Sequence, residues 1–166
     1  QYVYLPPGIQ AVRSIAKTWR DFQPWYAPAG MKRGQLVGPV DFWNHYADGD
    51  LDVLAMNQVN PLVRLKKEGD VIWGQKTSWN LASDFRDLNI RFLFITIEQA
   101  IASFARSLIF EFNNQLNRDF AALAVSRYLR GIQTLGGIEW FQVVCDESNN
   151  TTQVVANNEL VIDIYV

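Results

Sequence analysis

The chain has 166 residues, a length typical of a single domain. Hydrophobic residues make up 49% and aromatic residues 13% of the chain, which supplies enough apolar surface for a packed core and argues against disorder. The net charge is −2, with acids and bases interspersed, so no basic stripe suits a phosphate backbone. We therefore expect one domain, residues 1–166, and no direct nucleic-acid partner.

Charged residues interrupt every apolar run before it reaches the roughly 20 residues that a membrane-spanning helix needs. We expect no transmembrane helix and no direct membrane partner. Gln1 to Tyr4 contain neither an initiator Met nor a signal-peptide pattern, and Val166 ends a strand-like segment without a polar tail. These ends indicate a fragment of a longer protein. Cys145 is the single cysteine and is expected to pack as a small core residue.

Helical and strand-like patterns alternate in the first half of the chain. Apolar residues recur at helical spacing up to Arg20, which predicts a short amphipathic helix with these apolar positions: Ile9, Val12, Ile15, Ala16 and Trp19. A second short helix is expected from Asp50 to Met56, with acids in its first turn and a stop at Asn60-Pro61. Residues 62–65 and 71–74 flank a turn and predict a β-hairpin.

Two long helices are expected in the second half. The first, Leu88 to Phe112, is expected to be the main core helix, although residues 92–95 also have the content of a strand. Its apolar positions step by three or four: Ile90, Phe94, Ile97, Ile101, Phe104, Leu108 and Phe112. The second helix is capped by Asn113 or Asn114 and stopped by Gly136-Gly137. Its apolar positions are Leu116, Phe120, Leu123, Ala124 and Tyr128.

The last thirty residues change to an alternating pattern typical of strands. Residues 140–145 and 160–166 are expected to pair, with a turn at residues 148–151 between them. The expected fold class is α+β (mixed α/β), with two long helices packed on a small mixed β-sheet and a C-terminal β-hairpin.

Several motifs occur in a fixed order along the chain. The loop Tyr26-Ala27-Pro28-Ala29-Gly30 lies near Gly34, and Asn60-Pro61 precedes a Trp-Gly strand at Trp73-Gly74. These motifs resemble those of contractile tail sheath proteins, the phage tail sheath family, in which an Ala-Pro-Ala-Gly loop occurs. Three later blocks also resemble the family: Asn89-Ile90-Arg91-Phe92-Leu93, Phe110-Glu111-Phe112-Asn113-Asn114, and the final strands. The resemblance covers most of the chain, and the order of the blocks is more specific than any single block.

The chain departs from the family pattern at two positions. Phe92 replaces the second Arg of an Asn-x-Arg-Arg-Leu pattern, and Phe112 stands where Pro is usual. The second departure is expected to let the first long helix run further. The N-terminal region and the C-terminal arm of such subunits are missing, so we expect the isolated chain to be monomeric at micromolar concentration.

The resemblance implies a structural virion protein and not an enzyme. Such a subunit polymerises helically around a tail tube and contracts to drive the tube through the host envelope. Its partners would be other sheath subunits, the tail tube and baseplate proteins. It would be assembled in the host cytoplasm and would end up in the tail sheath of the virion. The resemblance implies no cofactor, metal or catalytic residue.

The chief alternative is a small hydrolase or ligand-binding domain with a cleft near His45, Asp41, Asp48 and Asp50. A second alternative is a rigid adhesion or shell domain inserted in a virion protein, which would share the charge balance but lack a sheet edge for strand addition. His45 is the only histidine and lies among aromatic residues, so a packing or surface role is preferred. The acids at 48–52 begin like a calcium loop, but Val53 and Val59 stand where that motif needs Gly and Glu. Helix capping explains the acids better. Asn149 to Thr152 contain glycosylation patterns and are interpreted as turn residues.

Overall fold

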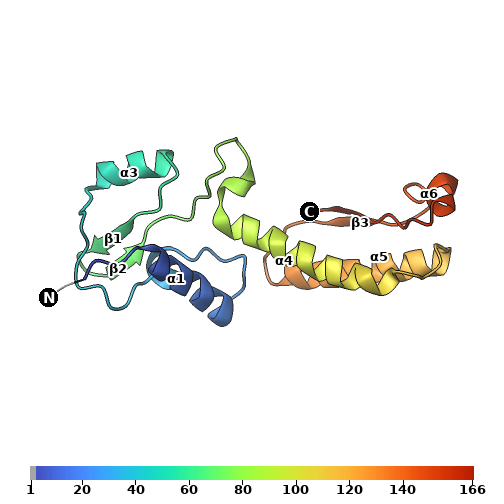
Figure 1. Ribbon diagram of the computed structural model, residues 1–166, viewed down its shortest axis with the longest axis horizontal. Helices are drawn as coiled ribbons and strands as arrows, with labels where there is room; N and C mark the ends of the chain where they lie inside the picture. The colour runs from blue at the N-terminus through green and yellow to red at the C-terminus, as the bar shows by residue number, and fades with distance from the viewer. Residues whose placement is uncertain (1–2) are drawn as a thin grey trace. The chain divides into compact units, whose positions relative to one another are not determined.

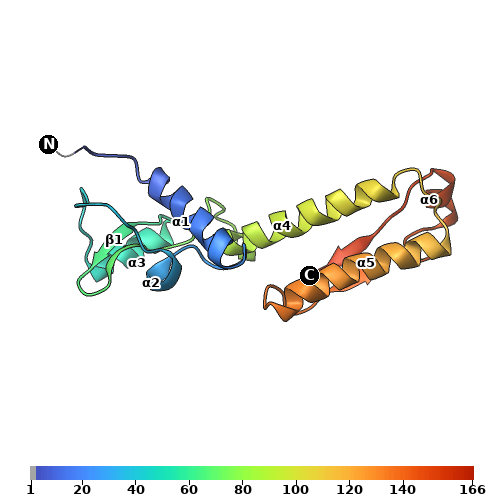
Figure 2. The same cartoon turned by 90° about the horizontal axis from the view of Figure 1, so that it is seen from below.

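The computed structural model describes residues 3–166, which divide into two compact units (Figures 1 and 2). The first unit extends to Thr96 and the second comprises Ile97–Val166. Helix α4 (Leu88–Ala105) contributes residues to both units. The expectation of a single domain over residues 1–166 stays a prediction.

The first unit combines short helices with one β-hairpin. Its elements are α1 (Gly8–Asp21), α2 (Gly30–Arg33), α3 (Asp48–Met56), β1 (Leu62–Leu65), β2 (Gly69–Ile72) and the 3-10 helix η1 (Asp84–Arg86). The hairpin is confirmed as an antiparallel pair in which Leu65 lies opposite Gly69. The second strand begins at Gly69 instead of Val71, because Gly69 adopts a φ of 88° that permits a tighter turn. The helix expected near Asp50 is confirmed.

A third segment covers the free edge of β2. The amide of Ile72 donates to the carbonyl of Gly34 (2.8 Å), and the amide of Leu36 donates to Asp70 (2.8 Å). Gly34 lies so close to Ala29 that an added Cβ would come within 2.7 Å of its backbone. β2 is therefore hydrogen-bonded on both sides, and Val71 at its centre is fully buried.

Helix α1 buries its polar face. Ser14 and Thr18 are buried, while Ile9 and Val12 of the expected apolar stripe are 61% and 67% exposed. The Ser14 hydroxyl lies 2.9 Å from the carbonyl of Pro28, within the Ala-Pro-Ala-Gly loop, and 3.0 Å from that of Arg33, at the end of α2. Burial without such partners would be costly. The polar face of α1 therefore holds this loop, and the apolar stripe faces away from it.

Asn60 joins the Asn-Pro and Trp-Gly motifs. Its side-chain Nδ2 donates to the carbonyl of Lys76, and its Oδ1 accepts from the Lys76 amide, both at 2.7 Å. The amide of Trp73 donates to the carbonyl of Pro61 (2.8 Å). At Gly74, where φ is 150°, an added Cβ would lie 2.7 Å from Asn60 Oδ1. Glycine is thus required for the close approach of the two segments.

The second unit packs helix α5 against a two-stranded antiparallel sheet. Besides part of α4, its elements are the 3-10 helix η2 (Arg106–Leu108), α5 (Gln115–Thr134), β3 (Gln142–Val144), α6 (Thr152–Ala156) and β4 (Asp163–Tyr165). Val143 lies opposite Ile164, which confirms the pairing of the C-terminal strands. Helix α6 lies in the long connection between them and was not expected. The α+β class is confirmed, with the strands in two antiparallel pairs and not in one mixed sheet.

The first long helix is shorter than expected. α4 ends at Ala105, a single 3-10 turn follows, and Phe110 adopts a left-handed φ of 74°. A helix cannot continue through such a residue. The expectation that Phe112, in place of Pro, lets the helix run further is therefore wrong.

Both ends of α5 agree with the sequence prediction. Asn114 caps its N-terminus, since its side chain accepts from the Asn117 amide at 2.9 Å. At the other end, Gly136 has a φ of 73°, and the Gly137 amide donates to the carbonyl of Ile132 (2.9 Å). The buried face differs from the expected apolar positions, and consists of Arg118, Ala121, Val125, Leu129 and Ile132.

Leu88–Leu108, which is α4 with the following 3-10 turn, is apolar enough to cross a membrane on length and composition alone. It has 21 residues and a mean hydropathy of 1.3, and 11% of its most apolar window is buried. The expectation of no transmembrane helix stays a prediction. A single helix of this kind is weak evidence for a membrane span, because helices in soluble proteins also meet the criterion. That the chain has no direct membrane partner stays a prediction.

We predict that Gly74→Ala destabilises the chain by about 2–4 kcal/mol, because alanine disfavours this φ and its Cβ would meet the Asn60 side chain. The control is Gly131→Ala within α5, where an added Cβ meets nothing within 4 Å. Gly131→Ala should stabilise the chain by up to about 1 kcal/mol. Urea unfolding measures both changes. Equal free energies of unfolding for the two variants would contradict the packing described.

We predict that Leu129→Ala and Leu123→Ala have very different costs although both lie on α5. Leu129 is 0% exposed and Leu123 is 70% exposed. Loss of the buried side chain should cost about 2–5 kcal/mol, and loss of the exposed one less than about 0.5 kcal/mol. Thermal and urea unfolding of the two variants measure the difference. A larger effect at Leu123 would show that the buried face of α5 is assigned wrongly.

Candidate functional site

The residues of the hydrolase alternative lie on the surface of the first unit. His45 Nε2 lies 3.6 Å from Asp41 Oδ1, and both side chains are more than 60% exposed. Asp50 accepts from the backbone amide of Ala47 (2.9 Å), so it caps α3 as expected. Asp48 occupies the first turn of the same helix. The structure therefore pairs His45 with Asp41, while Asp48 and Asp50 serve a helix terminus.

Arg64 is the centre of the charged contacts near Asp41. Its guanidinium lies 2.7 Å from Asp70 and 3.0 Å from Asp41, and 5.6 Å from the centre of the Phe42 ring. The hydrogen bond to Asp70 raises the pKa of Arg64 further above its ordinary value. Exposed ion pairs of this kind contribute little stability. This arrangement orders a loop on the hairpin and has no activated nucleophile.

Within residues 3–166, no cluster of three or more His, Cys, Asp or Glu side chains is arranged to hold a metal ion. The calcium-like stretch at 48–52 forms the start of α3, where Asp50 binds the helix N-terminus. The observed geometry of these acids is thus that of a helix cap.

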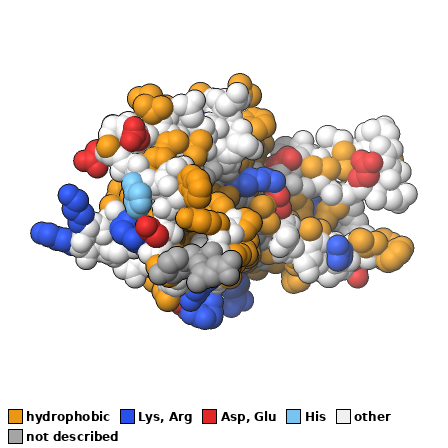
Figure 3. All heavy atoms as spheres, turned by 60° about the vertical axis from the view of Figure 1, so that its left-hand side comes forward, with side chains coloured by type: hydrophobic (Ala, Val, Ile, Leu, Met, Phe, Trp, Pro, Cys, Tyr) orange, Lys and Arg blue, Asp and Glu red, His pale blue; other side chains and the backbone are white. Residues whose placement is uncertain are grey.

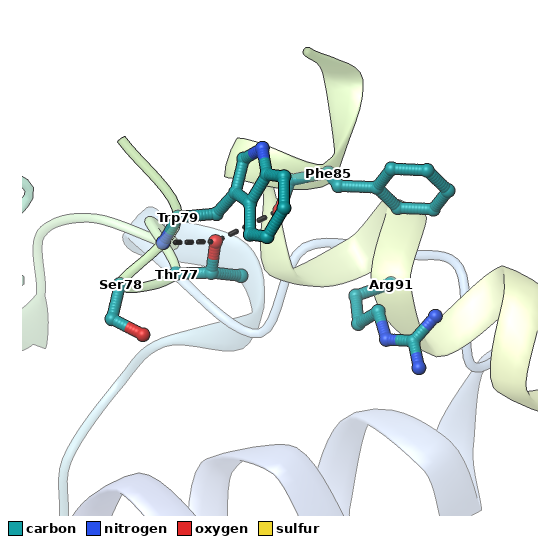
Figure 4. A pocket seen from close by; sticks show the side chains of 5 residues that line it. All are labelled: Thr77, Ser78, Trp79, Phe85 and Arg91. Atoms are coloured by element: carbon teal, nitrogen blue, oxygen red, sulfur yellow. Dashed lines mark hydrogen bonds between the residues drawn. The ribbon is translucent and has the colours of Figure 1, made fainter. Parts of the chain in front are cut away.

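A cavity of about 470 Å³ in the first unit is lined by Thr77, Ser78, Trp79, Phe85 and Arg91 (Figure 4). The Thr77 hydroxyl donates to the carbonyl of Phe85 (2.8 Å) and accepts from the Trp79 amide (3.3 Å). Its hydrogen-bonding capacity is thus used to hold the loop. The lining contains no carboxylate or histidine that could act as a base, so the cavity does not have the composition of a hydrolytic site.

The motif at the start of α4 packs on α1 and the preceding loop. Asn89 donates through Nδ2 to the carbonyl of Trp25 (3.2 Å). The Arg91 guanidinium lies 5.9 Å from the centre of the Phe85 ring. Phe92, which replaces an Arg of the family pattern, makes an edge-to-face contact with Trp19 at 5.0 Å. Phe92 therefore packs against Trp19, one of the apolar residues expected on α1.

Asparagine side chains join three loops of the second unit. Asn150 is 3% exposed, and its side chain forms two hydrogen bonds with the backbone of Val161. Its Oδ1 accepts from the Val161 N–H and its Nδ2 donates to the Val161 carbonyl, each at 2.9 Å. Asn113 donates to Asn150 Oδ1 (3.1 Å) and accepts from Arg118 Nε (2.6 Å). Burial of Asn150 removes it from the surface that glycosylation requires. Sequence reasoning identified the turn but missed this network.

Cys145 is buried next to this network, as expected for a small core residue. Burial raises the pKa of its thiol, which keeps the reactive thiolate scarce. The cysteine is therefore neither a nucleophile nor a ligand in the geometry observed.

Exposed apolar side chains are the most unusual feature of both units. Figure 3 shows hydrophobic side chains spread among charged ones on the face it presents. In the first unit they include Ile9, Val12, Val37, Val40 and Trp43. In the second unit they form what we term the outer apolar set: Ile109, Phe110, Phe112, Leu116, Phe120 and Leu123. Exposed apolar side chains that gather into a contiguous patch mark sites of protein–protein contact.

Known proteins are similar to this chain over most of its length. Residues 82–166 match the family described as the phage tail sheath C-terminal domain. The chain belongs to the phage tail sheath family. It is 39% identical over 144 residues to the tail sheath protein of Vibrio phage KVP40, and 33% identical over 163 residues to that of Enterobacteria phage T4. The matches cover 87% and 98% of this chain, respectively.

The chain corresponds to only part of these sheath proteins, since the matches span 22% and 25% of their lengths. Solved structures show the same fold. The sheath complex of the PVC extracellular contractile injection system, in its contracted state, has a TM-score of 0.91 at 20% identity, covering 99% of this chain and 48% of that one. The contracted helical sheath of the anti-feeding prophage has a TM-score of 0.85 at 22% identity, covering 98% and 46%.

We predict that Asn150→Ala destabilises the chain by about 2–3 kcal/mol, because it leaves the buried polar atoms around Val161 without partners. The matched control is Asn157→Ala, since Asn157 is exposed and its side chain only accepts from Gln153. That change should alter the free energy of unfolding by less than about 0.5 kcal/mol. Urea unfolding measures both. Similar small effects would show that the network is dispensable.

Proposed function

We propose that this chain is part of a subunit of a contractile tail sheath, a structural component of a phage virion. Its similarity to tail sheath proteins over nearly its whole length carries the proposal. In this proposal subunits polymerise helically around a tail tube and slide from an extended lattice into a shorter, wider one. That movement drives the tube through the host envelope.

The partners we propose are other sheath subunits, the tail tube and baseplate proteins, with no direct contact to nucleic acid or membrane. Sheath and baseplate assemblies are the sources of the similar structures. The exposed apolar side chains of both units supply surface for such contacts. Subunit contacts that differ between two lattices would store the free energy released on contraction.

We further propose that the chain is not an enzyme and needs no cofactor. The paired His45 and Asp41 are exposed and lie outside the cavity described above. The Thr77 hydroxyl in that cavity holds backbone groups, and the lining contains no carboxylate or histidine. These observations support a role in assembly over the hydrolase alternative.

We also propose that the native subunit is longer than residues 1–166. The chain spans about a quarter of the curated sheath proteins it matches. The family resemblance implies an arm that adds a strand to a neighbouring subunit, and strand addition joins copies through main-chain hydrogen bonds. The isolated chain would then assemble poorly.

We predict that the full-length sheath protein, expressed without other virion proteins, forms tubes visible by negative-stain electron microscopy. Polymerisation through repeated identical contacts produces helical tubes without a template. The isolated chain of 166 residues is the control and should remain monomeric at micromolar concentration. A full-length protein that stays monomeric, even with tail tube added as a nucleus, would overturn the proposal.

A further inference from the structure

Phe110 combines an unfavourable backbone conformation with complete exposure. Its φ of 74° is rare for a bulky residue. Such a conformation costs on the order of 1–3 kcal/mol and is kept where the surroundings or function require it. The side chain is 100% exposed, so it gains no packing within its own chain. Neither feature benefits the isolated chain.

The same unit has an apolar cavity between α4 and α5. It has a volume of about 170 Å³ and is lined by Ala100, Ile101, Phe104, Ala124, Val125 and Tyr128. No charged side chain lines it. An apolar cavity of about 150 Å³ is large enough to bind benzene. The cavity therefore matches a phenylalanine ring in both size and polarity.

We propose that the Phe110 ring of one copy inserts into this cavity of a second copy. The proposal rests on the proposed function, since it names a contact between subunits. Complete exposure of Phe110 means that the ring does not occupy the cavity of its own chain. The ring and the cavity are different surfaces of the same chain. A contact between them can therefore repeat from copy to copy and extend a polymer.

The size of the contact favours a lattice over a free dimer. An aromatic side chain buries about 150–250 Å², whereas a stable interface usually buries more than about 1,200 Å² in total. Other residues of the outer apolar set, such as Phe112 and Leu116, can add to the buried area. Even so, the contact is weak alone and becomes effective where neighbouring contacts hold the copies together.

Disulfide trapping between two variants of this chain tests the contact. Glu111→Cys places a thiol next to Phe110, and Arg127→Cys places one next to Tyr128 at the cavity; both native side chains are exposed. If the ring enters the cavity, the two thiols come close enough for a disulfide. Mixed at high concentration under mild oxidation, the pair should crosslink at least about five times faster than a mismatched pair.

The mismatched pair is Glu111→Cys with Arg130→Cys. Arg130 is also exposed on α5 but lies on the face away from Ala124 and Tyr128, given 3.6 residues per helical turn. The native Cys145 is buried and should not compete. Adding Phe110→Asn to the Glu111→Cys chain should abolish the preference, and asparagine tolerates the left-handed conformation, so the loop is preserved. Equal crosslinking rates, or a preference unaffected by Phe110→Asn, would overturn the proposal.

Trapping within tubes of the full-length protein separates this inference from the proposed function. A full-length chain with both Glu111→Cys and Arg127→Cys should give a ladder of crosslinked multimers, and one with Phe110→Asn in addition should not. Tubes without a ladder would overturn the Phe110 contact and leave the sheath proposal standing. If no tubes form even with tail tube added as a nucleus, the sheath proposal fails, and crosslinking of the isolated chains still decides the contact.

Discussion

Hydrogen bonds from side chains to the main chain hold the irregular segments on which this fold depends. Sheets contribute little, because the described residues form only two two-stranded pairs. Ser14 contacts the carbonyls of Pro28 and Arg33, Asn60 binds both backbone polar atoms of Lys76, and Asn150 does the same for Val161. Backbone groups in loops need hydrogen-bond partners, and these side chains supply them where no strand lies alongside. These side chains therefore fix the loops that support the helices.

The sequence predicted the helices well but assigned the buried faces of α1 and α5 wrongly. Periodicity locates an amphipathic helix, and caps such as Asn114 and the stop at Gly136-Gly137 determine its ends, so α1 and α5 lie where expected. Periodicity does not reveal what an apolar stripe contacts. On α1 the polar Ser14 and Thr18 are buried, while Ile9 and Val12 are exposed. In a chain that makes contacts between subunits, apolar residues serve two surfaces, and composition alone cannot distinguish them.

Other features depended on contacts that the sequence does not display. The turn before β2 is tight because Gly69 adopts a positive φ, and the chain leaves the helical conformation before Phe110, which also has a positive φ. Helix α6 has only five residues and no long apolar pattern. The order and spacing of the motifs carried the family resemblance. The sequence does not show why Asn60 and Gly74 occur together, because the close approach of their two segments exists only in the folded chain. The outer apolar set was missed for a similar reason, since exposure is a property of the folded chain.

Helix α5 shows how folding and assembly can use separate residues of one element. Ala121, Val125, Leu129 and Ile132 form its buried face, whereas Leu116, Phe120 and Leu123 lie on exposed positions. Because the two sets are distinct, contacts of the exposed set can change without disturbing the core packing of the unit. In the proposed contraction, a subunit must leave one set of neighbours and bind another while remaining folded. An element with an inner and an outer apolar set meets that requirement, whereas a single set would couple each change of partner to partial unfolding.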